Sequence, residues 1–229
     1  MKIAILTPTI YRPAGLRRSL SSLVYTVQTL SSIHEIDIVV AAEKDDVEAR
    51  AIAAEYGAMF TYCEEPLQGP AYAWNTALKA APDYDAYFTG SDDVEYTSGW
   101  LEEVLRVLKD ELDGSGLVGI NDGRWKRELV MRMCATHYLM TRDFIINHMG
   151  GVVAQPFYHA DFTDMEACAR SRLVNKFAWA ENALVIHHWN GPNGDLGYQR
   201  ATEKRPLMKP LYEKRKAKGF PNDFKAIIS

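Results

Sequence analysis

Short apolar runs alternate with amphipathic segments along the first half of the chain. The apolar runs predict buried strands at residues 2–7, 36–42, 59–63 and 117–120, with a further strand in the run from Tyr84 toward Asp92. The amphipathic segments between them predict helices at residues 13–30, 47–56, 69–81 and 99–112. Strands that alternate with helices of this length are typical of a parallel sheet with helices on both faces. We therefore expect one α/β domain with a mostly parallel central sheet.

The alternation of predicted strands and helices becomes irregular after about residue 122. Apolar residues without a helical period predict a strand over 129–141, followed by a short helix over 142–149. A helix is expected over 163–173, with Thr163 as N-cap and Glu166 three positions later in a capping box. A strand over 183–186 and a weakly helical tail over 198–218 complete the pattern. We expect a domain at 1–198, divided into halves at 1–121 and 122–198, and a basic C-terminal tail at 199–229.

Composition narrows the classes of partner. The formal net charge of −4 gives no overall attraction to nucleic acids or anionic membranes. The three cysteines are odd in number and widely spaced, which indicates reduced thiols in a cytoplasmic protein. The N-terminus lacks a signal-peptide pattern, and no apolar stretch approaches the ~18 residues of a membrane span, so we expect no membrane insertion.

Two adjacent carboxylates follow the aromatic run that begins at Tyr84. The run ends in Gly90, Ser91, Asp92 and Asp93. Ligands of open α/β sheets bind at the carboxyl ends of the strands. Adjacent carboxylates repel each other unless they are solvated or share a divalent cation, and oxygen ligands suit Mg²⁺ or Mn²⁺. The pair is therefore either a solvated turn or a site for Mn²⁺ or Mg²⁺ with Asp92 and Asp93 as ligands.

A histidine pair, His187 and His188, follows the predicted strand at 183–186. A lone histidine is usually structural, but a pair at a strand end in a chain with a carboxylate site is a candidate metal ligand. Neighbouring residues of a strand point to opposite faces, so one of the two can reach the ion.

Polar residues end three of the predicted strands, at 7–9, 43–46 and 91–93. We expect these groups to converge at one edge of the sheet. The chain has neither a GxGxxG after its first strand nor a GxxxxGK[ST], so the standard dinucleotide and P-loop interpretations lack support.

Four stretches of the chain follow one another in a recognisable order. They are Ile5–Thr9 with Arg12 and Leu20, Gly69–Asn75, Tyr87–Asp93, and Thr163–Arg170 followed by His187 and His188. Together they resemble glycosyltransferase family 2, a group of inverting enzymes with the GT-A fold. The resemblance extends over nearly all of the chain to about residue 198 and implies a GT-A-like domain with a C-terminal helical tail.

The resemblance implies a site for a nucleoside-diphosphate sugar, most simply a UDP-sugar. In the family, the first-strand loop touches the nucleotide, the second strand ends in an acid that reads the base, and a DxD motif holds the ribose and metal. Gly90 stands where the first Asp of that motif belongs. The residues implied to bind the donor are Thr7, Pro8, Thr9, Arg12, Glu43, Asp45, Gly69, Asn75, Ser91 and Asp92. The resemblance also places a late histidine at the metal, with His188 preferred over His187.

The family's later carboxylate motif places a general base six positions before an arginine. Asp164 stands six positions before Arg170 and is the implied base, with Asp161 as the fallback. A carboxylate on the acceptor side would take the proton of the attacking hydroxyl while a metal holds the departing diphosphate. The local alternative is that Asp164 and Glu166 only stabilise the start of a helix.

The leading hypothesis is a metal-dependent, inverting transfer of a sugar to an acceptor hydroxyl of unknown identity. The first alternative is a nucleotidyltransferase, which usually has a Gly-rich basic loop after the first strand, where this chain has Thr7–Pro13. The second is a non-catalytic nucleotide-sugar or carbohydrate-binding module, which would need no base. Function must be argued from the site, because a shared fold does not fix it.

Overall fold

The structure is a computed structural model that describes residues 1–124, 126–189 and 196–228. The strands are β1 (Lys2–Pro8), β2 (Glu35–Glu43), β3 (Met59–Cys63), β4 (Ala86–Thr89), β5 (Val94–Tyr96), β6 (Leu117–Asn121), β7 (Tyr138–Thr141) and β8 (Phe177–His187). The helices are α1 (Pro13–Val27), η1 (Leu30–Ser32), α2 (Val47–Glu55), α3 (Pro70–Ala80), α4 (Trp100–Leu112), α5 (Arg127–Arg132), α6 (Arg142–His148), α7 (Thr163–Leu173) and α8 (Leu196–Ala217).

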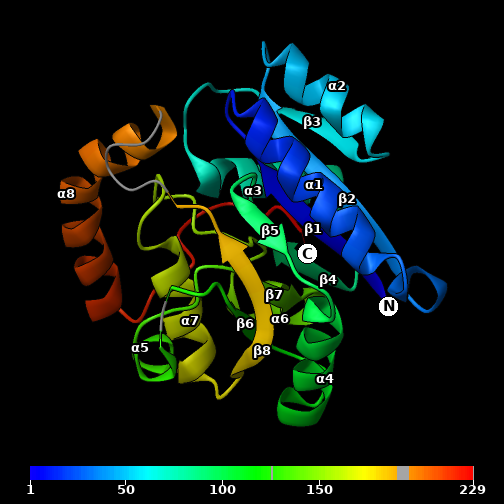
Figure 1. The fold of residues 1–229 in the computed structure, drawn as a ribbon. Helices are drawn as coiled ribbons and strands as arrows, with labels where there is room; N and C mark the ends of the chain where they lie inside the picture. The colour runs from blue at the N-terminus through cyan, green and yellow to red at the C-terminus, as the bar shows by residue number, and fades with distance from the viewer. Residues whose placement is uncertain (125, 190–195, 229) are drawn as a thin grey trace.

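The described residues form an eight-stranded sheet in the order β3-β2-β1-β4-β7-β6-β8-β5. The strands β3, β2, β1 and β4 run parallel, as do β6 and β8, whereas β7 and β5 pair antiparallel with their neighbours. The predicted α/β fold with a mostly parallel sheet is confirmed. β1 lies at the centre of the parallel half, so its carboxyl end adjoins those of β2 and β4 (Figure 1).

Alternate residues of the strands pack into two separate hydrophobic cores, one on each face of the sheet. Ile3 and Ile5 of β1 pack on one face, together with α1, α2 and α4, whereas Ala4 and Leu6 pack on the other face with α3, α5, α6 and α7. Both sets are fully buried, as expected for a sheet that is covered on both sides. The sheet is therefore a rigid middle layer that fixes the positions of its strand ends.

Two expectations for the second half were wrong. The segment predicted as one strand over 129–141 contains helix α5 and only the short strand β7. The predicted capping box is absent: the N-cap of α7 is Phe162, with φ +76°, and Thr163 is the first helical residue. The Thr163 hydroxyl instead accepts a hydrogen bond of 2.9 Å from the backbone of Gln155, and Glu166 faces the protein interior.

The C-terminal segment packs closely on the body of the protein. Arg215 of α8 donates two hydrogen bonds, of 2.9 and 3.0 Å, to the fully buried carboxylate of Glu166. The chain then returns to the body, where the amides of Ile227 and Ile228 both donate to the carbonyl of Gly151. Figure 1 shows α8 on the flank opposite α1 and α2.

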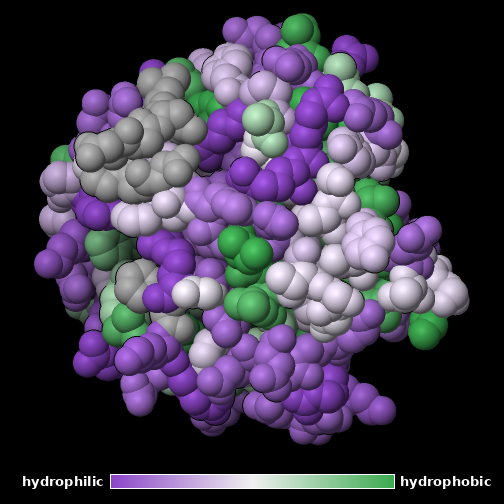
Figure 2. All heavy atoms as spheres, in the orientation of Figure 1, coloured by the Kyte–Doolittle hydropathy of each residue, from purple (hydrophilic) through white to green (hydrophobic). Residues whose placement is uncertain are grey.

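Figure 2 shows one face that is largely hydrophilic, with hydrophobic residues scattered between polar ones. Within the described ranges, no helix has the length and apolar character needed to cross a membrane.

Candidate active site

A pocket of about 550 Å³ opens where β1, β2 and β4 end. Its walls contain many of the residues predicted to bind donor, metal or acceptor. These are Pro8, Thr9, Arg12, Glu43, Gly69, Ser91, Asp92, Asp93, Asp161, Asp164 and His187. The convergence of three strand ends, expected from the alternating pattern, therefore produces one shared cavity.

Four predicted residues are not among the described lining residues of this pocket: Thr7, Asp45, Asn75 and His188. Thr7 is fully buried beneath Gly90, and the exposed Asp45 accepts a hydrogen bond of 2.5 Å from the hydroxyl of Tyr11. The amide of Asn75 bonds the backbone of residues 153 and 154, so its role here is to hold that loop.

The loop wall of the pocket depends on Gly69 and Glu43. Gly69 has φ +90°, and a Cβ at this position would lie 2.2 Å from the carbonyl oxygen of His159. Only glycine allows this close approach between the start of α3 and the later loop. Glu43, at the end of β2, accepts a hydrogen bond of 2.9 Å from the amide of Leu67 and is 7% exposed. Its carboxylate is thereby fixed at the edge of the cavity.

Asp92 is buried and neutralised by protein groups. Thr9 donates a hydrogen bond of 2.7 Å to one carboxylate oxygen, and Arg12 donates one of 3.0 Å to the other. Burial raises the pKa of Asp92 to about 6, although the charge of Arg12 opposes this shift. Asp92 thus ties the loop after β1 to the end of β4.

Asp93 also lies 3.9 Å from the guanidinium of Arg12, but its other neighbours differ from those of Asp92. His187 at the end of β8 places its Nε2 3.5 Å from Asp93, and its Nδ1 lies 3.3 Å from Asp122. Burial alone would lower the pKa of His187, but Asp122 and Asp93 raise it to about 9. One ligand atom each from Asp93, His187 and the buried His137 lie within 4.8 Å of one another. These three residues form the best candidate metal centre among the described residues.

The geometry favours His187 as a metal ligand, whereas the sequence analysis preferred His188. The Nε2 of His188 lies 2.9 Å from the carboxylate of Glu95, a residue outside the pocket lining. Sequence reasoning missed His137, which precedes β7 and enters the site only because β7 pairs with β4. It also missed Asp122 beyond β6. No local motif marks either residue.

The two candidate bases differ in their surroundings. Asp161 forms a two-pronged ion pair with Arg205 of α8, with both hydrogen bonds 2.9 Å long. Asp164 has no such cation among the described residues; its carboxylate accepts from the Cys134 thiol at 3.4 Å and from the amide of Met165 at 2.8 Å. Burial raises the pKa of Asp164 to about 6. A carboxylate with this pKa is ionised at neutral pH and is a better proton acceptor than one paired with a guanidinium.

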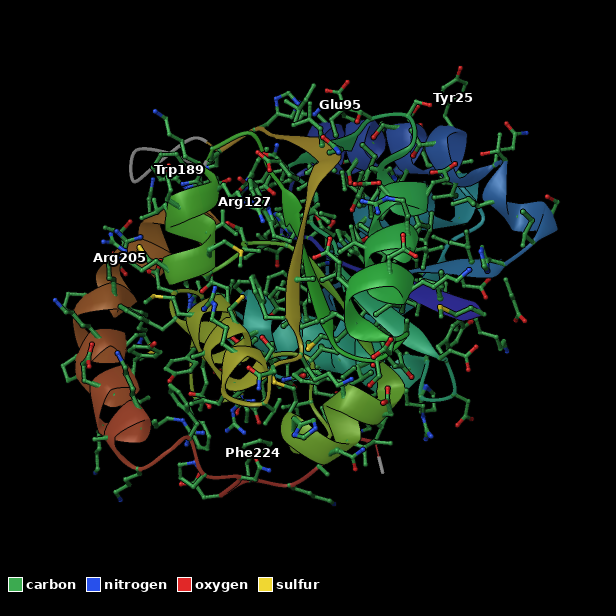
Figure 3. All side chains as sticks on the ribbon, turned by 90° about the horizontal axis from the view of Figure 1, so that it is seen from below. Tyr25, Glu95, Arg127, Trp189, Arg205 and Phe224 are labelled. Carbon is green, nitrogen blue, oxygen red and sulfur yellow. The ribbon has the colours of Figure 1, made fainter. Side chains whose placement is uncertain are left out.

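The first turn of α8 covers the side of the pocket that contains Asp93. The hydroxyl of Tyr198 donates a short hydrogen bond to Asp93, and the guanidinium of Arg12 lies 4.6 Å from the centre of the Tyr198 ring. Trp189, just after β8, stacks on Arg124, with 4.4 Å between the guanidinium and the ring centre. Figure 3 shows Trp189 and Arg205 on the same flank, opposite Tyr25 of α1.

Comparison with known families decides the classification. The sequence model described as "Glycosyl transferase family 2" matches residues 4–163. The chain belongs to glycosyl transferase family 2. The matched range contains the strand ends, the acidic pair and the start of α7, and thus most of the pocket described above. No curated protein matches the sequence.

Solved structures share the fold at low sequence identity. TarS 1–349 of S. aureus in complex with UDP superimposes with a TM-score of 0.65 and 15% identity, covering 94% of this chain and 71% of that chain. For another structure of TarS 1–349 the shares are 78% and 58%, with a TM-score of 0.61 and 16% identity. This chain thus spans little more than half of the TarS structure in that alignment.

A second relative in structure is the glucosyl-3-phosphoglycerate synthase of Mycobacterium tuberculosis. Its complex with Mn²⁺, UDP-glucose and phosphoglyceric acid gives a TM-score of 0.62 at 14% identity and covers 92% of this chain and 78% of that chain. At these identities the likeness establishes the GT-A fold, which the resemblance in sequence implied.

Proposed function

We propose that this protein is a metal-dependent, inverting glycosyltransferase that moves a sugar from a nucleoside-diphosphate sugar to an acceptor hydroxyl. The observation that carries the proposal is that one pocket holds both a candidate metal set around Asp93 and a separate carboxylate, Asp164, with a raised pKa. A nucleotide-sugar transferase needs these two groups on opposite sides of the reacting sugar.

The donor would bind along the ends of β1, β2 and β4. Pro8 and Thr9 line the pocket beside Glu43, which would contact the base or ribose, and Gly69 permits close approach of backbone to ligand. We propose UDP as the nucleotide, because structures of similar fold hold UDP or UDP-glucose. This assigns residues 1–121 to the donor and 122–198 to the metal histidine, base and acceptor.

The residues present fit a divalent cation. Oδ1 of Asp93 and Nε2 of His137 are buried and lack a hydrogen-bond partner among the described residues, as expected for two atoms that bind an ion. Mn²⁺ suits a mixed carboxylate and imidazole set better than Mg²⁺ does. When bound, the cation would neutralise the charge that develops on the leaving diphosphate.

Asp164 would act on the acceptor side. Its carboxylate would accept the proton of the acceptor hydroxyl as that oxygen attacks the anomeric carbon from the face opposite the diphosphate, which inverts the configuration. Asp161, held by Arg205, would instead fix α8 at the rim of the pocket. The three cysteines are free thiols, which fits the reducing cytoplasm that we propose as the location.

A thermal-shift panel of nucleoside diphosphates tests this function, because a ligand that binds only the folded protein raises its melting temperature. UDP with Mn²⁺ is expected to give the largest shift, and UDP with a chelator a much smaller one. A panel in which no nucleoside diphosphate shifts the melting temperature, with or without Mn²⁺, would contradict the proposal.

A further inference from the structure

His137 has the orientation of a metal ligand, although nothing in the sequence marks it as one. Its ring is buried, with 2% of the residue exposed. Nδ1 lies 2.8 Å from the carbonyl oxygen of Thr89, and because a carbonyl only accepts, Nδ1 must carry the proton. In the neutral ring, Nε2 then carries a lone pair. That atom is buried and has no hydrogen-bond partner among residues 1–124, 126–189 and 196–228.

The lone pair of His137 adjoins two further ligand atoms. The ring centres of His137 and His187 are 5.1 Å apart, and ligand atoms of both rings and of Asp93 lie within 4.8 Å of one another. Asp93 Oδ1 is likewise buried without a partner in the described part of the chain. Buried polar atoms without a partner are costly unless something bridges them.

The outer contacts of both histidines match those of metal-bound imidazoles. Such rings almost always donate their second N–H to a carbonyl or carboxylate, which fixes the tautomer. His137 does so to Thr89, and the Nδ1 of His187 lies 3.3 Å from the carboxylate of Asp122. Nε2 of His137 thereby has a free lone pair, and an ion at this point would replace the proton that lies between Nε2 of His187 and Asp93.

We propose that His137 is a third protein ligand of the donor-site cation, completing a two-histidine, one-carboxylate set with His187 and Asp93. The inference rests on the proposed function only for the use of that cation in the reaction. Three ligands fixed by the fold bind an ion before any nucleotide arrives and leave positions open for diphosphate oxygens. Two imidazoles also select Mn²⁺, Co²⁺ or Fe²⁺ over Mg²⁺, which prefers oxygen ligands.

The test measures binding of Mn²⁺ alone to the nucleotide-free protein by electron paramagnetic resonance, because bound Mn²⁺ loses the sharp spectrum of the free ion. His137→Gln is expected to weaken binding by at least about 10- to 100-fold, the usual loss for changes around a metal site. His188→Gln is the matched control, since His188 faces Glu95, and should leave the affinity unchanged. Circular dichroism establishes that each variant is folded.

Electron spin-echo modulation counts the imidazoles on the bound ion, which a merely structural histidine would not affect. Two imidazole nitrogens are expected in the wild-type protein and one in His187→Gln, the remaining one being His137. A single imidazole in the wild-type protein, or unchanged Mn²⁺ affinity in His137→Gln, would overturn the inference.

The same measurement separates this inference from the proposed function. Wild-type protein that binds Mn²⁺ only together with UDP, through one imidazole, would remove His137 from the ligand set and leave the glycosyltransferase intact. Protein that binds Mn²⁺ neither alone nor with UDP would overturn both the ligand assignment and the proposed metal dependence.

Discussion

Arg12 donates a hydrogen bond of 3.0 Å to Asp92, whereas one carboxylate oxygen of the adjacent Asp93 has no hydrogen-bond partner among the described residues. The acidic pair that ends the β4 segment therefore contains two different groups. Asp92 is neutralised by Arg12 and holds the loop after β1. Asp93 is directed toward His187 and His137, where a cation would complete its surroundings.

This difference predicts that the two Asp→Asn variants are not equivalent. Asp93→Asn should weaken Mn²⁺ binding by at least about tenfold, because an amide oxygen brings no charge to the ion. Asp92→Asn, the matched control, should lose less Mn²⁺ affinity, since the Asp92 carboxylate already accepts hydrogen bonds from Arg12 and Thr9. Calorimetric titration of Mn²⁺ in the presence of UDP measures both. If Asp92→Asn loses as much Mn²⁺ affinity as Asp93→Asn or more, Asp92 is the metal ligand instead.

Glu43 is expected to contribute to nucleotide binding. Glu43→Ala should weaken UDP binding by about tenfold, the usual effect of losing one charged hydrogen bond. Glu43 also accepts from the amide of Leu67, so Glu43→Gln, which keeps an acceptor oxygen, is the control for the shape of the loop. Calorimetry with UDP gives the affinities. Unchanged UDP affinity in a folded Glu43→Ala protein would place the nucleotide elsewhere.

Glu166 is expected to stabilise the fold rather than take part in transfer. Its carboxylate is fully buried and accepts hydrogen bonds from Arg170, Arg215 and Tyr158. Removing one member of a buried charged network costs about 3–5 kcal/mol, so Glu166→Gln should lower the free energy of unfolding by about that much. Asp110→Asn, at an exposed pair with Arg106, should cost under about 1 kcal/mol. Urea unfolding compares the two, and equal losses would refute the role of Glu166.

Asp164 is expected to destabilise the protein at neutral pH. Its pKa is raised from 3.8 to about 6 by burial, so the folded state binds this proton more tightly than the unfolded state. No penalty exists below pH 4; the penalty grows as pH rises toward 6 and is complete above it. Asp164→Asn should therefore melt higher than the wild type at pH 8 and equally at pH 4. If Asp164→Asn melts lower than the wild type at pH 8, the claim that the buried charge of Asp164 destabilises the folded protein is wrong.

The parallel half of the fold was readable from the sequence because its signals are local. Each strand from β1 to β4 is a short apolar run, and each ends in residues that line or support the pocket. The rule that parallel strands share one ligand-binding edge then brings Glu43 and Asp93 together without knowledge of the structure. Asp164, which the family resemblance selected by its position six residues before Arg170, also lines the pocket.

The remaining features depend on contacts between distant parts of the chain. Glu166 fits a capping box in sequence, but the buried partner Arg215 lies 49 residues away and draws it inward. His137 enters the candidate metal centre through the antiparallel pairing of β7 with β4. Its neighbouring helix α5 was predicted as strand, because a short segment with mixed apolar residues has no resolved period.

Asp164→Asn provides the most direct test of the account as a whole, when transfer rate, donor affinity and melting temperature are measured on the same protein at pH 8. Asp161→Asn is the matched control, because Asp161 is already paired with Arg205.

In Asp164→Asn we expect transfer to fall by about 10²–10⁴-fold, the usual contribution of a positioned base, with UDP-sugar affinity nearly unchanged and a melting temperature at or above that of the wild type. A folded Asp164→Asn protein that binds the donor and transfers sugar at a near wild-type rate would contradict the account.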